Sequence, residues 1–105
     1  MNNNFYWGDA ERAFALTLPL IEELERQTDA GVPHLIRALH AQDYRVAHLK
    51  TILRLSLIGG GCDPERAAEL AETYLIPMGL EKARLIALVT LAALMGLNDD
   101  DISEE

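Results

Sequence analysis

The spacing of apolar residues changes at residue 17, and this change constrains the fold more than any other feature of the sequence. From there to about residue 95, apolar side chains recur every three or four positions, which is typical of helices with one buried face. Short strands cannot produce this pattern over so many residues. We therefore predict helices over residues 18–28, about 32–41, the segment that follows Asp43, 64–75 and about 80–95.

Capping residues and glycines mark the ends of these segments. Asp43 precedes the third helical pattern, and Asp63 stands directly before Pro64, in the order of an N-cap and a first helical residue. The glycine triplet 59–61 is the clearest interruption of the sequence. Because glycine adopts left-handed conformations without a Cβ penalty, one of the three is expected to close the preceding helix. Gly96 is the expected end of the last helix.

The residues before the first predicted helix do not show the helical spacing of apolar residues. An aromatic run at 5–7 is followed by Gly8-Asp9, which is turn chemistry, and then by a weakly alternating segment, so a β-hairpin is expected over about residues 5–16. A chain of 105 residues suits one domain. The predicted fold class is mainly α: a small helical bundle of about five helices with a short N-terminal β-hairpin, forming one domain over residues 1–97. Residues 98–105 (NDDDISEE) are expected to be an acidic, disordered tail.

Charge and composition exclude several classes of function. The chain has 9 basic and 17 acidic residues, a net charge of −8, whereas a nucleic-acid binder needs a basic surface. The longest apolar run, 85–97, is too short to span a membrane. The N-terminus lacks the pattern of a signal peptide, and a single cysteine allows no intrachain disulfide. We expect a soluble, cytoplasmic protein with no nucleic-acid or membrane partner.

No set of residues predicts catalysis or cofactor binding. The glycine triplet follows a helix and lacks the Lys-Ser or Lys-Thr of a phosphate loop, and Asp63 would repel a phosphate there. His34, His40 and His48 are spaced six and eight apart, whereas two metal ligands on one helix need a spacing of three or four. Cys62 has no catalytic partner at a recognisable spacing, and a small thiol filling a linker is the simpler interpretation. We therefore expect no catalytic, cofactor-binding or metal-binding residue, and no enzyme.

Two segments carry more apolar surface than a small bundle easily covers. Adjacent strand residues point to opposite faces, so the run 5–7 should expose at least one aromatic ring; in the alternative, the hairpin lies flat on the bundle with only Tyr6 at the surface. The last predicted helix is apolar nearly all round, so it is either central in the bundle or shared with a partner. The partner-binding residues predicted on this basis are Phe5, Trp7, Leu88, Leu91 and Met95.

The order of segments resembles a known family. Its elements are the hairpin segment from Gly8 to Leu16, the Leu-Ile-Glu-Glu-Leu-Glu stretch 20–25, residues 54–61 (RLSLIGGG), the proline-started helix at 64–67 and an Ala-Leu-rich last helix ending at Gly96. Together they resemble the small tail assembly chaperones of gene transfer agents and related tailed phages, a family also labelled tail tube protein. The resemblance covers roughly residues 8–97, and residues 54–67 are its most specific part.

The resemblance implies a function that composition alone does not. Such chaperones are small helical proteins that associate with the tape-measure protein before the tail tube polymerises around it, without catalysis or cofactors. The expected partners are the tape-measure protein or other tail proteins, with self-association as a further expectation. One alternative is a structural tail tube or tail-completion subunit. A weaker one is a small helical DNA-binding regulator, because residues 44–75 form a helix–turn–helix pattern, although residues 64–75 carry three acids against one arginine.

Overall fold

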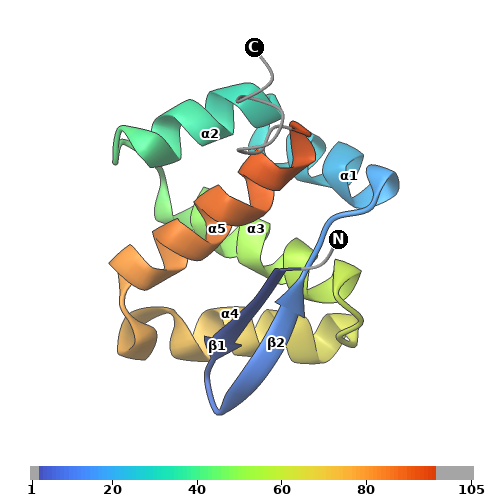
Figure 1. Cartoon of the computed structure of the whole chain (residues 1–105), viewed down its shortest axis with the longest axis vertical. Coiled ribbons are helices and arrows are strands. Elements are labelled where there is room, and N and C mark those ends of the chain that lie inside the picture. Colours follow the sequence, from blue (N-terminus) through green and yellow to red (C-terminus); the bar gives the residue numbers. More distant parts are fainter. Residues whose placement is uncertain (1–2, 97–105) are drawn as a thin grey trace, which may run out of the picture.

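The computed structural model of the chain describes residues 3–96, which form a two-stranded hairpin followed by five helices (Figure 1). This arrangement confirms the mainly α class and the short N-terminal hairpin. The predicted tail 98–105 and the predicted domain end at 97 lie outside the described residues. In chain order the elements are β1 (Asn3–Trp7), β2 (Ala10–Phe14), α1 (Leu18–Thr28), α2 (Val32–His40), α3 (Val46–Gly59), α4 (Pro64–Met78) and α5 (Leu80–Leu94).

The hairpin is tight because glycine occupies its first turn position. β1 and β2 are antiparallel, and Trp7 pairs with Ala10 across the two-residue loop Gly8-Asp9. Gly8 has a φ of 78°, whereas Asp9 does not take a positive φ, which is the pattern of a type II′ turn. This turn has the twist that joins antiparallel strands directly, so the predicted hairpin is confirmed, with strands that start at residue 3 and end at residue 14.

The helix ends follow the predicted capping chemistry at Asp63 but not at Asp43. The Asp63 carboxylate accepts hydrogen bonds from the backbone amides of Glu65 (3.2 Å) and Arg66 (3.4 Å) at the start of α4. The predicted N-cap at Asp43 was wrong, because the residue before α3 is Arg45. The Asp43 amide instead donates to the Ala38 carbonyl at 2.8 Å and thereby closes α2.

The same closing arrangement ends both α2 and α3. After α3, the Cys62 amide donates to the Leu57 carbonyl and the Gly61 amide to the Ile58 carbonyl, with Gly61 at a φ of 109°. These two bonds define a Schellman motif, in which the left-handed position is usually glycine. The prediction that one glycine of the triplet closes the helix is therefore confirmed, and that glycine is Gly61.

The predicted end of α4 at residue 75 was three residues too early. The helix continues to Met78 and contains Pro77 in its last turn. Proline cannot donate to the carbonyl four residues before it, which here belongs to Thr73. Thr73 is solvent-exposed, so water can bond that carbonyl and the helix does not have to stop.

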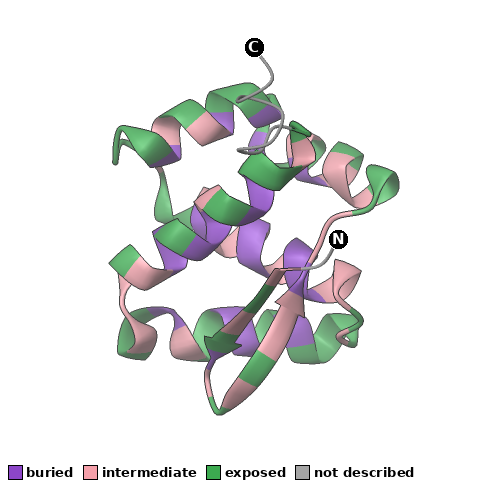
Figure 2. Cartoon of the chain, viewed as in Figure 1, coloured by how far each residue is buried: buried purple, intermediate pink, exposed green. Residues whose placement is uncertain are grey.

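α3 is the centre of the bundle. It packs against α1, α4, α5 and β2, and its buried residues contribute Leu49, Ile52 and Leu53 to the core. Figure 2 shows the buried residues of α3 at the centre, with the exposed residues of the other helices around them. Within residues 3–96, no helix is long and apolar enough to cross a membrane.

Candidate protein-interaction surface

The hairpin is fastened to α4 through Trp7. The Trp7 indole N–H donates to the Leu70 carbonyl at 3.0 Å, and the Trp7 side chain is 0% exposed. Phe5, on the same face, is half-buried and meets Phe14 edge-to-face at 5.8 Å between ring centroids. Tyr6 points the other way and is exposed. The expected exposure of Trp7 was therefore wrong, and the hairpin lies flat on the bundle with Tyr6 at the surface.

The glycine triplet allows this close docking, which sequence reasoning missed. A Cβ on Gly59 would stand 2.0 Å from the Ala15 carbonyl oxygen, and one on Gly60 would stand 2.0 Å from the Ala13 carbonyl oxygen. The Ala15 amide also donates to the Ser56 carbonyl at 3.0 Å. The backbone of β2 thus lies directly on the last turn of α3, so these glycines serve packing as well as helix termination.

An apolar stripe runs along the side of α5 that faces away from the bundle. Leu85 is 47% exposed and Val89 is 44% exposed, and Ala92 continues the same line at a spacing of three. These three residues are called the outer face of α5 below, and Figure 2 shows the exposed segments of the helix on that side. The spacing i, i+4 and i+7 is the one at which a helix meets a second helix or a groove.

The predicted α5 residues divide between the outer face and the core. Leu91 is fully buried, so its predicted exposure was wrong: it lies six residues from Leu85, which turns it about 120° round the helix, away from the outer face and into the core. Leu88 is half-buried at the edge of the outer face, and Met95 is exposed beyond its end. The structure therefore leaves apolar surface on α5, but at Leu85 and Val89, which the sequence did not single out.

A buried arginine fixes the orientation of α5. The Arg84 guanidinium donates to the Leu39 carbonyl at 2.9 Å, near the end of α2, and to both carboxylate oxygens of Glu81, at 3.1 and 2.6 Å. The hydrogen bonds between Arg84 and Glu81 raise the pKa of Arg84 and lower the pKa of Glu81. Because Arg84 and Leu85 are adjacent in the chain, tying Arg84 to α2 turns Leu85 outward.

Comparison with known families places the chain among tail proteins. The family described as phage tail tube protein, GTA-gp10, matches residues 2–96. The chain belongs to this family. No curated protein and no solved structure matches it. The resemblance to phage and gene transfer agent tail proteins is thus confirmed at the level of the family, and other tail proteins are its natural partners.

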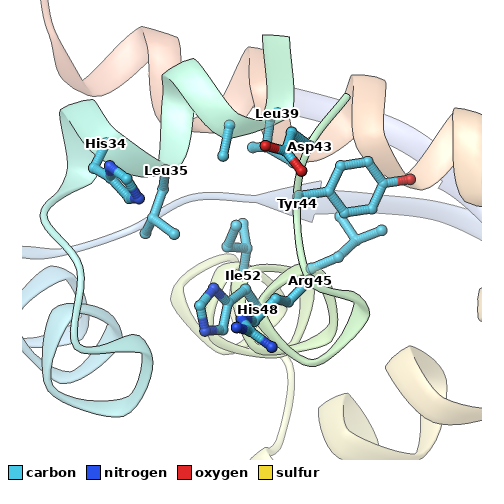
Figure 3. A pocket seen from close by; sticks show the side chains of 10 residues that line it. His34, Leu35, Leu39, Asp43, Tyr44, Arg45, His48 and Ile52 are labelled. Carbon is cyan, nitrogen blue, oxygen red and sulfur yellow. The ribbon is translucent and has the colours of Figure 1, made fainter. Parts of the chain in front are cut away.

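This tail protein also has a small pocket between α2 and α3, with a volume of about 100 Å³ (Figure 3). Its floor is apolar and buried, and includes Leu35 and Ile52. His34 and His48 lie on opposite helices at its rim, whereas His40 does not line it. Within the described residues, no group of three or more histidine, cysteine or acidic side chains is placed to hold a metal ion.

The N-terminus of α4, where the glycine triplet would have to bind a phosphate, is occupied by a side chain of the protein itself. The Asp63 carboxylate accepts the free amides of the first turn, and its negative charge opposes an incoming anion. Cys62 is half-buried just before this cap.

Proposed function

We propose that this tail protein is an assembly chaperone that binds an apolar helical segment of the tape-measure protein through the outer face of α5. The observation that carries the proposal is the exposed stripe of Leu85, Val89 and Ala92 on a helix whose other side is fully engaged in the core. Membership of a tail family supports a tail protein as the client. The resemblance to tail assembly chaperones supports the tape-measure protein in particular.

The stripe suits a helix as its partner. Leu85 and Val89 are each close to half exposed, and burying the rest of such side chains contributes about 1 kcal/mol each. Glu81 and Lys82 precede the stripe, so polar groups border one end of the apolar surface, as in the rims of protein interfaces. The function requires binding without catalysis. The net charge of −8 favours solubility while apolar surface is exposed, and we propose that the protein works in the cytoplasm of the host cell.

The test is co-expression of the full chain with a tape-measure protein from the same phage or gene transfer agent. We expect wild type to co-purify with the client, and Leu85→Glu combined with Val89→Glu to weaken the complex about 30-fold, since each side chain contributes about 1 kcal/mol. The matched control is Leu18→Glu, because Leu18 is 66% exposed and lies on α1. All variants must keep wild-type helicity and stay folded at the temperature of co-expression. Equal client recovery by the double variant and wild type would refute the α5 surface, and no recovery by wild type would refute the chaperone function.

A structural tail tube subunit is the second candidate, and the description of the matching family favours it. The two functions differ in what remains in the finished particle. A chaperone should be absent from purified particles, whereas a tube subunit should be present at a fixed ratio to the other tail proteins. Quantitative mass spectrometry of purified particles separates the two.

A further inference from the structure

The outer face of α5 is continued by one charged residue at its N-terminal end. Lys82 stands three positions before Leu85, so together with the outer face it gives successive spacings of three, four and three residues. These are the spacings of the a and d positions in a coiled coil, so the four residues form one seam along the helix. A single charged residue in an otherwise apolar seam fixes the register of a helix that packs against it.

The N-terminal hairpin holds the side chain of Lys82 in place. β1 packs beside α5 (Figure 1), and the Lys82 ammonium lies over the ring of Tyr6, 5.7 Å from the ring centroid. The face of an aromatic ring attracts a cation in this arrangement. Tyr6 is itself 53% exposed, so both groups stand at the surface of the protein. The surface around the outer face of α5 therefore extends onto the hairpin.

Within residues 3–96, no carboxylate forms an ion pair with Lys82. Its chain neighbour Glu81 is bonded through both carboxylate oxygens to Arg84. Glu11 lies opposite Tyr6 in the hairpin, but it is not part of an ion pair in this range either. An ammonium group has three N–H donors, and a carboxylate is its strongest partner. A helix that packs on the seam is therefore favoured when it sets a carboxylate against Lys82.

We propose that Lys82 selects a client helix with a carboxylate in its apolar seam, and fixes the register of that helix along α5. This inference rests on the proposed function, because it concerns the same surface. The partner is an amphipathic helix whose apolar residues meet the outer face of α5 and whose acidic residue meets Lys82. Tyr6 is a positioning residue, since its ring holds the ammonium at the end of the seam. The selection opposes the net charge of −8, which attracts basic partners at long range.

The test uses two synthetic helical peptides and the full chain. The peptides share an apolar a and d seam and differ only at its central position, which is glutamate in one and lysine in the other. Because the position is central, either direction of the peptide along α5 can set it against Lys82. In fluorescence anisotropy titrations with monomeric peptide, wild type should bind the glutamate peptide about 10-fold more tightly. Salt at about 0.15 M limits the influence of the net charge to about 8 Å.

Charge reversal provides the decisive comparison. Lys82→Glu should reverse the preference, so that the lysine peptide binds more tightly than the glutamate peptide. Arg37→Glu is the matched control, because it changes the net charge equally at an exposed residue of α2 and should keep the wild-type preference. Tyr6→Leu should reduce the preference about 3-fold without loss of helicity, whereas Tyr6→Phe keeps an aromatic face and should retain it.

The outcomes separate this inference from the proposed function. Equal binding of the two peptides by wild type, or an unreversed preference in Lys82→Glu, would overturn the selection and leave the outer face of α5 as a binding surface. Peptide binding that survives Leu85→Glu combined with Val89→Glu would overturn both. If neither peptide binds wild type, the selection is overturned, and co-purification with the tape-measure protein decides the proposed function on its own. An undiminished preference in Tyr6→Leu would overturn the role of Tyr6.

Discussion

Substitution of Gly60 by alanine tests whether the hairpin depends on the close contact with α3. Gly60 has a φ of −82°, which alanine adopts freely, so the substitution adds only a methyl group. That methyl group would stand 2.0 Å from the Ala13 carbonyl oxygen and 2.6 Å from its carbon. The obstacle is backbone paired within the hairpin, so β2 has to move by about 1 Å or more, and overpacking of this kind costs about 1–3 kcal/mol.

Displacement of the hairpin also weakens the bond from the Trp7 indole to the Leu70 carbonyl, which contributes about 1 kcal/mol. We expect Gly60→Ala to lower the free energy of unfolding by about 3 kcal/mol, which corresponds to a fall in melting temperature of roughly 12–24 °C for a domain of this size. Trp7 is the only tryptophan of the chain, so its fluorescence reports hairpin docking directly, and its emission should move to longer wavelength.

Gly61→Ala is the matched control for this experiment. The φ of 109° at position 61 would strain the backbone of any residue other than glycine. Among the described residues, however, no atom lies within 4 Å of a Cβ added there. It should lower the free energy of unfolding by about 1–2 kcal/mol through backbone strain and leave the Trp7 emission unchanged. Urea unfolding followed by fluorescence and circular dichroism measures both quantities. A Gly60→Ala protein within about 0.5 kcal/mol of wild type, with native emission, would show that the contact is not restrictive.

Substitutions at three further positions test separate parts of the fold. Trp7→Phe removes the donor to the Leu70 carbonyl and should lower the free energy of unfolding by about 1–2 kcal/mol in urea titrations followed by circular dichroism; no change would show that this bond is not stabilising. Asp63→Ala should cost about 1 kcal/mol in thermal melting through loss of the α4 cap, and Asp63→Asn should restore most of it. Hydrogen bonds from Arg26 and then Gln27 lower the pKa of Glu23 from 4.5 to about 2, so these contacts stabilise the fold above pH 4.5 and lose their effect as the pH falls towards 2. Glu23→Gln should therefore flatten the dependence of unfolding free energy on pH in that window, and an unchanged slope would contradict the assignment.

The helices were predictable because their local signals agree with their packing. The bounds 18–28 match the structure, and Asp63-Pro64 begins α4 as its cap chemistry indicates. The cap predicted at Asp43 was wrong because Asp43 belongs to the turn that ends α2, and α3 begins only at Val46. In that turn Gln42 takes the left-handed conformation, and the sequence gives no sign of this because glycine usually takes that position.

The site was less predictable because it depends on contacts between distant segments. Strand alternation correctly separates Tyr6 from Phe5 and Trp7, but it does not say which side faces the bundle. The contact with α4 decides which side faces the bundle, because the Leu70 carbonyl accepts a hydrogen bond from the indole of Trp7, 63 residues away in the sequence. The close approach of β2 to Gly60 likewise could not be predicted from the neighbouring sequence, because the end of the helix is already a sufficient reason for the glycine triplet.

The position of the apolar stripe makes binding and stability separable in this protein. The buried side of α5 includes Ile86 and Leu91, and the bond from Arg84 to α2 holds the helix from that side rather than from its outer face. Leu85 and Val89 are each about half buried, so substituting either should lower the free energy of unfolding by no more than about 1 kcal/mol. A loss of client binding on substituting these two residues would therefore report the contact itself. An equal loss of client binding on substituting Trp7 would show only that the fold was disturbed, because the Trp7 side chain is fully buried under its strand.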